Sequence, residues 1–198
     1  MINKPADHPE IKANKIGILL VNLGTPESTD TKSIRKYLKE FLSDRRVIDV
    51  PRVLWWIILN FIILNTRPKK TGAAYKKIWL DNDQDGSPLR KITRLQSEKL
   101  SEMFKNENII VDYAMRYGNP AIYSKLNEFK QKGCDRIIIF SLYPQYSGPT
   151  TATVNDEVCK WMLKQKWQPS IRIIPPYFDN PEYISSISKS ILKSFKEN

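Results

Sequence analysis

The residues best suited to nucleophilic or metal chemistry are few in this sequence: one histidine, His8, and two cysteines, Cys134 and Cys159. His8 lies in a polar segment ahead of the first apolar run, so we interpret it as a solvated tail residue. Because a structural zinc site needs four nitrogen or sulfur ligands, these three residues are too few to build one. The sequence therefore predicts no metal site and no catalysis by a serine–histidine or cysteine–histidine pair.

Glycine-rich phosphate-binding motifs are missing as well. The seven glycines never give the GxGxxG spacing of dinucleotide-binding proteins, and no Walker A sequence occurs. The 32 Lys and Arg against 21 Asp and Glu give a net charge of +11, which favours an anionic partner. No basic run reaches five residues and the interleaved stacking aromatics of an RNP motif are missing, so we expect no nucleic-acid partner. Most of the charge is interpreted as a lysine-rich solvated surface.

The elements that would position a site alternate between strands and helices. Apolar runs at 16–22, 109–115, 136–142 and 171–174 have the length and continuity of buried parallel strands. Helices are expected between them, and a last helix from about 181 to 195. This alternation predicts an α/β fold, in which helices cover both faces of a parallel sheet.

Local signals set the ends of two of these helices. Thr29 or Asp30 is expected as the N-cap of the helix after the first strand. Asn119 and Pro120 are expected to open the helix after the second strand, with the proline at its first position, and Gly133 to end it.

A long excursion, residues 51–105, separates the first two strands, and we expect three helices in it. It leaves the sheet at the edge where ligands of parallel α/β proteins bind. Its segment 53–64 is apolar on nearly all sides, but as a helix it would span only about 18 Å, too short to cross a bilayer. Two interpretations stay open: an ordinary core helix, or an exposed lip that covers a greasy ligand or enters the membrane interface, with Trp55 and Trp56 at headgroup level. The basic residues that follow, as far as Lys70, suit anionic lipid or ligand carboxylates.

Seven motifs then occur in the order found in ferrochelatases, the enzymes that insert ferrous iron into protoporphyrin, and the sequence resembles that family over about residues 14–151. The two most specific motifs are MRYGNP at 115–120 and LYPQYS at 142–147. The other five are LLVNLGTPE at 19–27, FLSDRRV at 41–47, the apolar segment followed by RPK at 67–69, YKKI at 75–78 and GSPL at 86–89.

The resemblance implies a Rossmann-like, chelatase-like parallel sheet with helices on both faces, and a second similar domain across a porphyrin cleft. We expect a polar tail at 1–14, a first domain at 15–167 that includes the apolar lip at 51–70, and the opening strand and helix of an incomplete second domain at 168–198. The family's metal-site histidine and glutamate belong to motifs that do not occur in this sequence. The isolated chain is therefore expected to be inactive.

By matched position, three residues resemble family residues that bind porphyrin propionates: Arg67, Tyr75 and Ser87. A guanidinium, a phenol and a hydroxyl are suitable donors to carboxylates. Without the resemblance, a solvated surface and a helix cap explain the same three residues. Leu23 resembles a position that faces the macrocycle; because a leucine cannot ligate iron, we assign it packing only.

Arg116 and Tyr117 resemble a pair that lines the active-site wall and could assist a proton relay, although an arginine cannot act as a base. Tyr143 and Tyr146 follow the third strand at the same edge and are assigned to substrate binding. Turn stabilisation is the alternative for all four residues. Some relatives hold an iron–sulfur cluster through a cysteine at the position of Gly148, so here we expect no cluster and no bound cofactor.

The function implied by the resemblance is a lyase reaction of haem biosynthesis, the insertion of Fe²⁺ into protoporphyrin IX to form protohaem. The expected location is the cytoplasm, since two lone thiols suit a reducing compartment, with a peripheral membrane contact through 53–64 as an addition. Two other functions stay open: a porphyrin-binding module without chemistry, and a basic α/β protein that binds a membrane surface or nucleic acid. The oligomeric state and the choice between proto- and coproporphyrin are left open.

Overall fold

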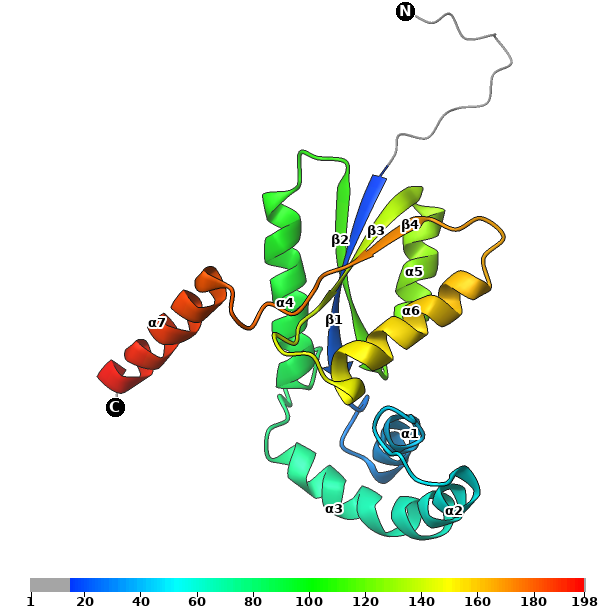
Figure 1. The fold of residues 1–198 in the computed structure, drawn as a ribbon. Helices are drawn as coiled ribbons and strands as arrows, with labels where there is room; N and C mark the ends of the chain where they lie inside the picture. Colours follow the sequence, from blue (N-terminus) through cyan, green and yellow to red (C-terminus); the bar gives the residue numbers. More distant parts are fainter. Residues whose placement is uncertain (1–14, 198) are drawn as a thin grey trace, which may run out of the picture.

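A four-stranded parallel sheet organises residues 15–197, the part of the chain that the computed structural model describes (Figure 1). The strand order is β2-β1-β3-β4. All neighbours pair in parallel, so the carboxyl ends of the strands meet at one edge. The predicted α/β fold is confirmed. The strands are β1 (Lys15–Gly24), β2 (Ile109–Tyr117), β3 (Cys134–Ser141) and β4 (Ser170–Ile173).

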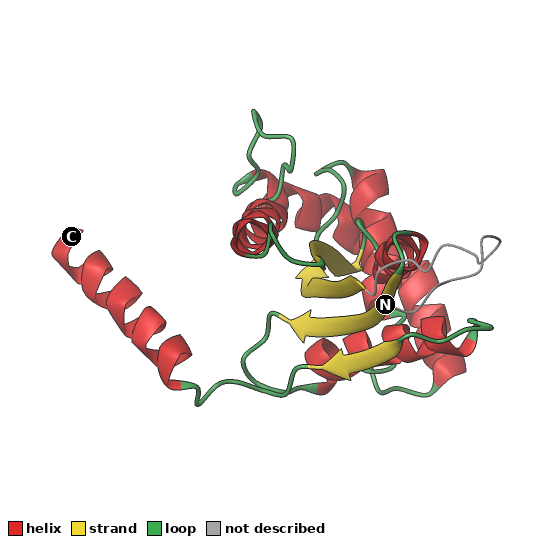
Figure 2. Cartoon of the chain, turned by 90° about the horizontal axis from the view of Figure 1, so that it is seen from above, coloured by secondary structure: helices red, strands yellow, loops and turns green. Residues whose placement is uncertain are grey.

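Helices cover both faces of this sheet (Figures 1 and 2). α4 (Pro88–Met103) packs on β2 and β1 from one side, and α5 (Ile122–Gln131) packs on the same strands and β3 from the other, beside α6 (Thr153–Leu163). The main core lies between the sheet and the α5–α6 layer, where Phe129 and Trp161 are fully buried. The indole N–H of Trp161 donates to Asn127 (2.9 Å), which satisfies the only polar group of that side chain.

β4 pairs with β3, with Ile138 opposite Arg172. The strand that we expected to open a second domain is therefore the fourth strand of this sheet, and that expectation was wrong. A short parallel strand next to β3 extends the existing backbone ladder, which needs no second sheet. α7 (Pro181–Glu197) projects from the sheet (Figure 1), and none of its residues is buried. Its assignment to a second domain stays a prediction.

One continuous helical run replaces the first two of the three helices expected between the first two strands. α2 (Arg52–Ile57), the π-helical turn η1 (Ile58–Ile63) and α3 (Leu64–Lys76) follow each other without a break. The wider turn leaves backbone carbonyls to which nearby side chains donate hydrogen bonds. The Asn65 amide, for example, donates to Phe61 O (2.9 Å). Within the described residues, no helix combines the length and the apolar run needed to cross a bilayer.

α1 (Thr31–Leu42) begins as predicted, because the Asp30 carboxylate accepts the backbone N–H groups of Lys32 (2.8 Å) and Ser33 (3.0 Å). Its buried side packs against α3 and η1. A second π-helical turn, η2 (Gly148–Ala152), leads into α6.

The predicted start of α5 was wrong, whereas its predicted end is confirmed. The Asn119–Pro120 peptide is cis, and the helix begins only at Ile122. Pro120 is held outside the helix because its carbonyl accepts the N–H of Met115 (2.7 Å) and thereby extends the β2 backbone pairing. Gly133 follows the helix with a φ of +83°, a conformation that favours glycine.

Candidate functional site

The carboxyl ends of the strands face α1 and the helical run α2–η1–α3, as Figure 1 shows. Gly24 ends β1 with a φ of +113°, and a Cβ atom there would lie 1.8 Å from the carbonyl oxygen of Tyr117. Only glycine allows the ends of β1 and β2 to approach so closely. The Gly24 carbonyl accepts a hydrogen bond from the Tyr37 hydroxyl (3.4 Å), which ties this edge to α1.

Aromatic rings fill the space between the strand ends and these helices, and we call Tyr37, Phe41, Tyr75 and Tyr117 the aromatic cluster. Phe41 stacks on Tyr37 (centroids 6.1 Å apart) and meets the edge of Tyr117 at 5.0 Å. Tyr75 from α3 meets Tyr37 edge-to-face at 6.3 Å. Leu23, half-buried, packs against the same group. The structure thus brings together Leu23, Tyr75 and Tyr117, three residues from the sequence prediction.

Tyr143 joins this neighbourhood from the end of β3. Its hydroxyl is buried and has no hydrogen-bond partner among the described residues. Burial, and to a smaller extent the neighbouring Tyr117, raise the pKa of the Tyr143 hydroxyl well above its ordinary value, so it stays protonated. It is therefore available as a donor for an oxygen acceptor at this edge.

Other unpaired polar atoms gather at the same edge. Six buried side-chain nitrogen or oxygen atoms lack a hydrogen-bond partner within residues 15–197, and only that of Asp135 lies at the opposite edge of the sheet. Buried polar groups in folded proteins are almost always paired, so this edge has the capacity to bind a polar ligand or ordered water. The five atoms belong to Thr25, Arg90, Ser141, Tyr143 and Asn155.

Asp44, just after α1, is the centre of a buried polar network. Its Oδ2 atom accepts from Arg116 (2.5 Å), from the Tyr117 hydroxyl (2.8 Å) and from the Thr153 hydroxyl, while Oδ1 accepts the backbone N–H of Arg46 (2.7 Å). Burial alone would raise the pKa of the Asp44 carboxyl, but these hydrogen bonds and the charge of Arg116 outweigh it and lower the pKa. The network fixes the end of β2 against α1 and the start of α6.

The guanidinium of Arg116 and the hydroxyl of Tyr117 both donate hydrogen bonds within this network. The Arg116 guanidinium lies 4.3 Å above the centre of the Tyr117 ring, and only 9% of its side chain is exposed. It also approaches Glu157 at 3.5 Å. Their role in lining an active-site wall stays a prediction, because both polar groups are engaged within the domain.

The three predicted propionate-binding residues lie at different depths. Tyr75 meets Trp79 at 6.5 Å, and the Trp79 ring covers Gly86, where a Cβ atom would lie 2.5 Å from the ring. Ser87 follows directly and is buried at the N-cap position of α4, where its side chain makes no capping hydrogen bond, the role that the alternative interpretation gave it. Tyr75 and Ser87 are thereby brought to one region. Arg67 is exposed on α3, eight residues or about 12 Å along the helix from Tyr75.

Tyr146 is not brought into the aromatic cluster. Its side chain is 59% exposed, and it lies near Arg46 rather than among the other tyrosines. An open groove of about 980 Å³ adjoins this position and carries charges of both signs. Among the described residues, no three His, Cys, Asp or Glu side chains are placed to hold a metal ion together. The groove is lined among others by Glu40, Asp44, Arg46, Arg116, Asp156 and Lys160.

Two central residues, Asp44 and Tyr37, received no role from the sequence. Tyr37 carries the helical spacing of a core residue, and Asp44 occurs only within one of the family motifs, FLSDRRV. Their partners, Gly24 and Thr153, are far away along the chain, so no local spacing could have indicated the contacts.

Comparison with known proteins places the whole described chain in one family. The family model described as Ferrochelatase matches residues 15–198. The ferrochelatase of Rhizobium etli (strain CIAT 652) is 51% identical over 191 residues, which cover 96% of this chain and 55% of that protein. The ferrochelatase of Rhizobium meliloti (strain 1021) is 50% identical over 188 residues, covering 94% and 55%. The chain thus spans a little over half the length of these curated relatives.

Proposed function

The chain belongs to the ferrochelatase family, and we propose that it forms the porphyrin-binding part of an enzyme that inserts Fe²⁺ into protoporphyrin IX in haem biosynthesis. In that reaction Fe²⁺ takes the place of two pyrrole N–H protons, which leave as H⁺. The observation that carries the proposal is the aromatic cluster at the carboxyl edge of the sheet, beneath the lip, in a member of this family.

A porphyrin is a flat apolar ring with two carboxylates on one side, so its site needs an apolar wall and hydrogen-bond donors. Leu23 and the half-buried Tyr75 supply apolar and aromatic surface at the edge, and the protonated hydroxyl of Tyr143 lies near Tyr117 of the same cluster. We assign Arg67, Tyr75 and Ser87 to the propionates. Arg67 has no ion pair among the described residues, so its guanidinium is available to a carboxylate.

We further propose that this chain binds porphyrin without metallating it. In the described part of the chain no cluster of metal ligands occurs, and the buried arginine beside Tyr117 cannot accept the pyrrole protons. An iron–sulfur cluster is not part of the proposal, since Gly148 supplies no thiolate. The cytoplasm is proposed as the location because Cys134 and Cys159 are both free thiols.

The test is a titration of the chain with protoporphyrin IX, followed by the shift of the porphyrin absorption band. Arg67→Ala is expected to weaken binding about tenfold, the effect of losing one charged hydrogen bond at an exposed site. Lys99→Ala is the matched control, since it removes an exposed cation on α4, away from the residues assigned to the propionates, and is expected to leave binding unchanged.

The dimethyl ester of protoporphyrin separates the propionate contact from ring binding. The chain and Arg67→Ala should bind the ester equally, because the ester has no carboxylate for the guanidinium. If Arg67→Ala weakens binding of the ester as much as binding of the free acid, the proposed contact between Arg67 and a propionate is refuted. Steady-state production of haem from Fe²⁺ and protoporphyrin by the chain alone would refute the proposal that the chain binds porphyrin without metallating it.

A further inference from the structure

Exposed apolar side chains gather on two helical parts of the described chain, the lip and α7. Of the two interpretations of the lip, the structure supports the exposed one, because only Leu59 is buried along Arg52–Ile63. Trp55 was wrongly expected at the headgroup level beside Trp56, because its indole N–H points inward and donates to Leu42 O (2.7 Å). The contact of the lip with a membrane stays a prediction. α7 is a separate apolar surface, far from the lip (Figure 1).

α7 carries an apolar face that is uncovered in the described part of the chain. Four aliphatic residues and one phenylalanine follow helical spacing along one side of the helix, and between 45% and 77% of each is exposed. The three lysines of α7 lie on the opposite side. Such a distribution is typical of a helix that packs on other protein surface. The apolar residues are Ile184, Ile187, Ile191, Leu192 and Phe195.

The sheet has an uncovered area of its own, on the face that α4 packs against. Asn22 of β1 marks this face, because its amide donates to the Thr93 hydroxyl of α4 (3.0 Å). α4 packs on β2 and β1. Over β3 and β4 a depression of about 270 Å³ is left, which we call the sheet hollow. The residues around it are Ile16, Arg136, Ile137, Ile138, Ser170 and Arg172.

The strand register confirms that the sheet hollow lies on the α4 side. Every second residue of a strand points to the same face, so Ile16 and Ile18 share the face of Asn22. Ile16 pairs with Arg136, and Ile18 pairs with Ile138, so these side chains of β3 point the same way. Parallel sheets are normally covered on both faces. Among residues 15–197, the half of this face over β3 and β4 lacks that cover.

The segment between β4 and α7 fixes the direction in which α7 leaves the sheet. The backbone N–H of Tyr177 donates to Pro144 O (2.9 Å), and the Tyr177 ring meets Phe140 near the end of β3 (5.3 Å). Tyr183, in the first turn of α7, meets Tyr177 edge-to-face at 5.5 Å. The Asn180 side chain accepts the backbone N–H of Tyr183 (3.2 Å) and so caps the helix.

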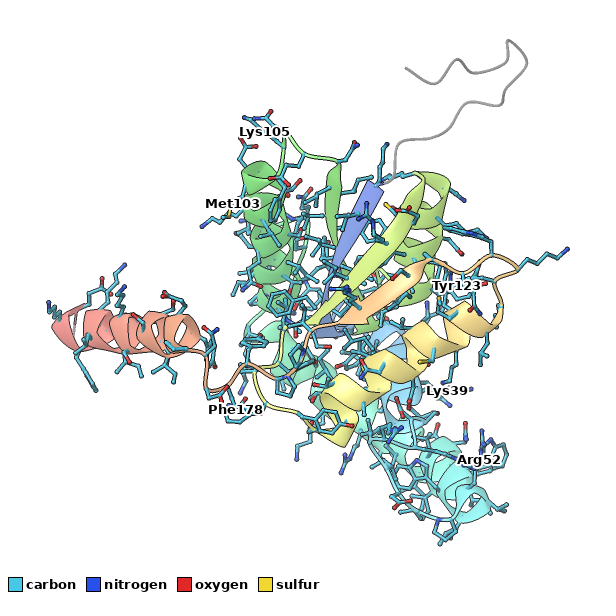
Figure 3. The ribbon with its side chains drawn as sticks, turned by 45° about the horizontal axis from the view of Figure 1, so that its top comes forward. Lys39, Arg52, Met103, Lys105, Tyr123 and Phe178 are labelled. Carbon is cyan, nitrogen blue, oxygen red and sulfur yellow. The ribbon has the colours of Figure 1, made fainter. Side chains whose placement is uncertain are left out.

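These contacts direct α7 away from its own sheet. In Figure 3 the chain passes Phe178 and then runs outward, and Figure 2 shows α7 and the strands well apart. The apolar face of α7 and the sheet hollow therefore belong to one chain but do not meet. Each is open to the corresponding surface of a second copy.

We propose that two copies of this chain exchange α7, so that the helix of each copy lies in the sheet hollow of its partner. α7 has 17 residues and is about 25 Å long, which matches the length of the eight-residue strand β3, about 26 Å. A two-fold axis relates the two contacts, so the assembly closes as a dimer. The interface does not rest on porphyrin binding.

The buried area favours this exchange over a simple pairing of the two α7 helices. Burial of about 100 Å² on each of five side chains, with a similar area on the opposite surface, gives about 1,000 Å² for one helix contact. Pairing of α7 with α7 makes one such contact and leaves both hollows open. Exchange makes two contacts, about 2,000 Å² in all, which is in the range of stable dimers. Arg136 and Arg172 fit the rim, because their aliphatic stems can lie along the helix while the guanidinium groups stay in water.

Sedimentation equilibrium of the full chain measures its mass, and a dimer is expected at about 10 µM and above. Ile187→Glu with Ile191→Glu places two charges on the apolar face and should raise the dissociation constant more than about a hundredfold. The matched control, Ser186→Glu with Ser190→Glu, adds the same charge to the polar side of α7 and should change the constant less than about threefold. All four side chains are exposed, so circular dichroism should show an intact fold in both variants.

Cross-linking between two variants tests the exchange itself. Both chains carry Cys159→Ser, which removes the exposed native thiol. One chain carries Ser170→Cys in the sheet hollow, and the other carries Ile191→Cys on α7. A short bismaleimide should link the two chains when they are mixed, and should link each chain to itself far less.

Three results would overturn the proposal. The first is the mass of a monomer at all concentrations up to about 100 µM. The second is a dimer whose dissociation constant is the same in the Ile187→Glu, Ile191→Glu variant and in its control. The third is cross-linking of Ile191→Cys to itself but not to Ser170→Cys, which would show that α7 pairs with α7 and leaves the sheet hollow open.

Discussion

Asp44→Asn is the substitution that tests the buried network most sharply. It keeps the size of the side chain but removes the charge and replaces one acceptor oxygen by an amide that donates. Oδ2 of Asp44 is the acceptor for Arg116, Tyr117 and Thr153, and only 10% of the Asp44 side chain is exposed. Arg116, 9% exposed, would keep only Glu157 at 3.5 Å as a counter-charge.

Removing one partner of a buried ion pair usually costs 3–5 kcal/mol, and we take the lower end, about 3 kcal/mol, because some water reaches this pair. The control is Arg46→Ala, which breaks the half-exposed ion pair between Arg46 and Asp156 and should cost less than about 1 kcal/mol. Urea unfolding followed by tryptophan fluorescence measures both, with an unchanged dependence on urea concentration. A cost below 1 kcal/mol for Asp44→Asn, or one equal to the control, would refute the reasoning.

A double-mutant cycle separates the pair from the rest of the network. Arg116→Met alone should also destabilise the chain, but combined with Asp44→Asn it should cost about 2 kcal/mol less than the sum of the two, since no unpaired charge is left. Strict additivity would show that the two side chains do not depend on each other.

Three further predictions concern pH, the tyrosines and the close approach of two strands. Folding lowers the pKa of Asp44, so its charge adds stability that is fully present above the unfolded pKa of about 4 and is lost as pH falls through the folded pKa. The difference in unfolding free energy between the chain and Asp44→Asn should therefore shrink below about pH 4. A constant difference down to pH 2 would contradict this. Tyr143→Phe removes a buried hydroxyl that has no hydrogen-bond partner among the described residues and should stabilise the chain by up to about 1 kcal/mol. Tyr117→Phe loses the hydrogen bond to Asp44 and should destabilise the chain by about 1 kcal/mol. Urea unfolding measures both variants, and the reverse order of stability would contradict the assignment. Gly24→Ala should destabilise the chain by several kcal/mol, because its Cβ would overlap the Tyr117 carbonyl, and a thermal midpoint within about 2 °C of the unchanged chain would contradict that.

Much of the fold could be predicted because the longer strands and the helix ends are marked by local sequence patterns. Continuous apolar runs such as 16–22 are typical of parallel strands covered on both faces, and the Asp30 cap and Gly133 stop are decided within a few residues. The place of β4 could not be read this way, because a four-residue strand carries no sign of which sheet it joins. The start of α5 was predicted wrongly at Pro120 for a similar reason. The Pro120 carbonyl accepts the backbone N–H of Met115, a contact that the local sequence pattern does not indicate.

The site was predictable in its position and less so in its arrangement. Strand ends of a parallel sheet meet at one edge, so Leu23, Tyr117 and Tyr143 were expected near each other, and Leu23 and Tyr117 belong to one packed group beside which Tyr143 lies. Asp44 could not be assigned, because its importance comes from three partners on distant elements.

The most direct test of the central claim is to map porphyrin binding on the isotope-labelled chain by NMR. Diamagnetic protoporphyrin IX should shift the backbone amide signals of Leu23, Tyr75, Ser87 and Tyr143 together, at the carboxyl edge beneath the lip, and leave those of α5 unchanged. Shifts confined to α5, or to the opposite edge of the sheet around Arg136, would contradict the account.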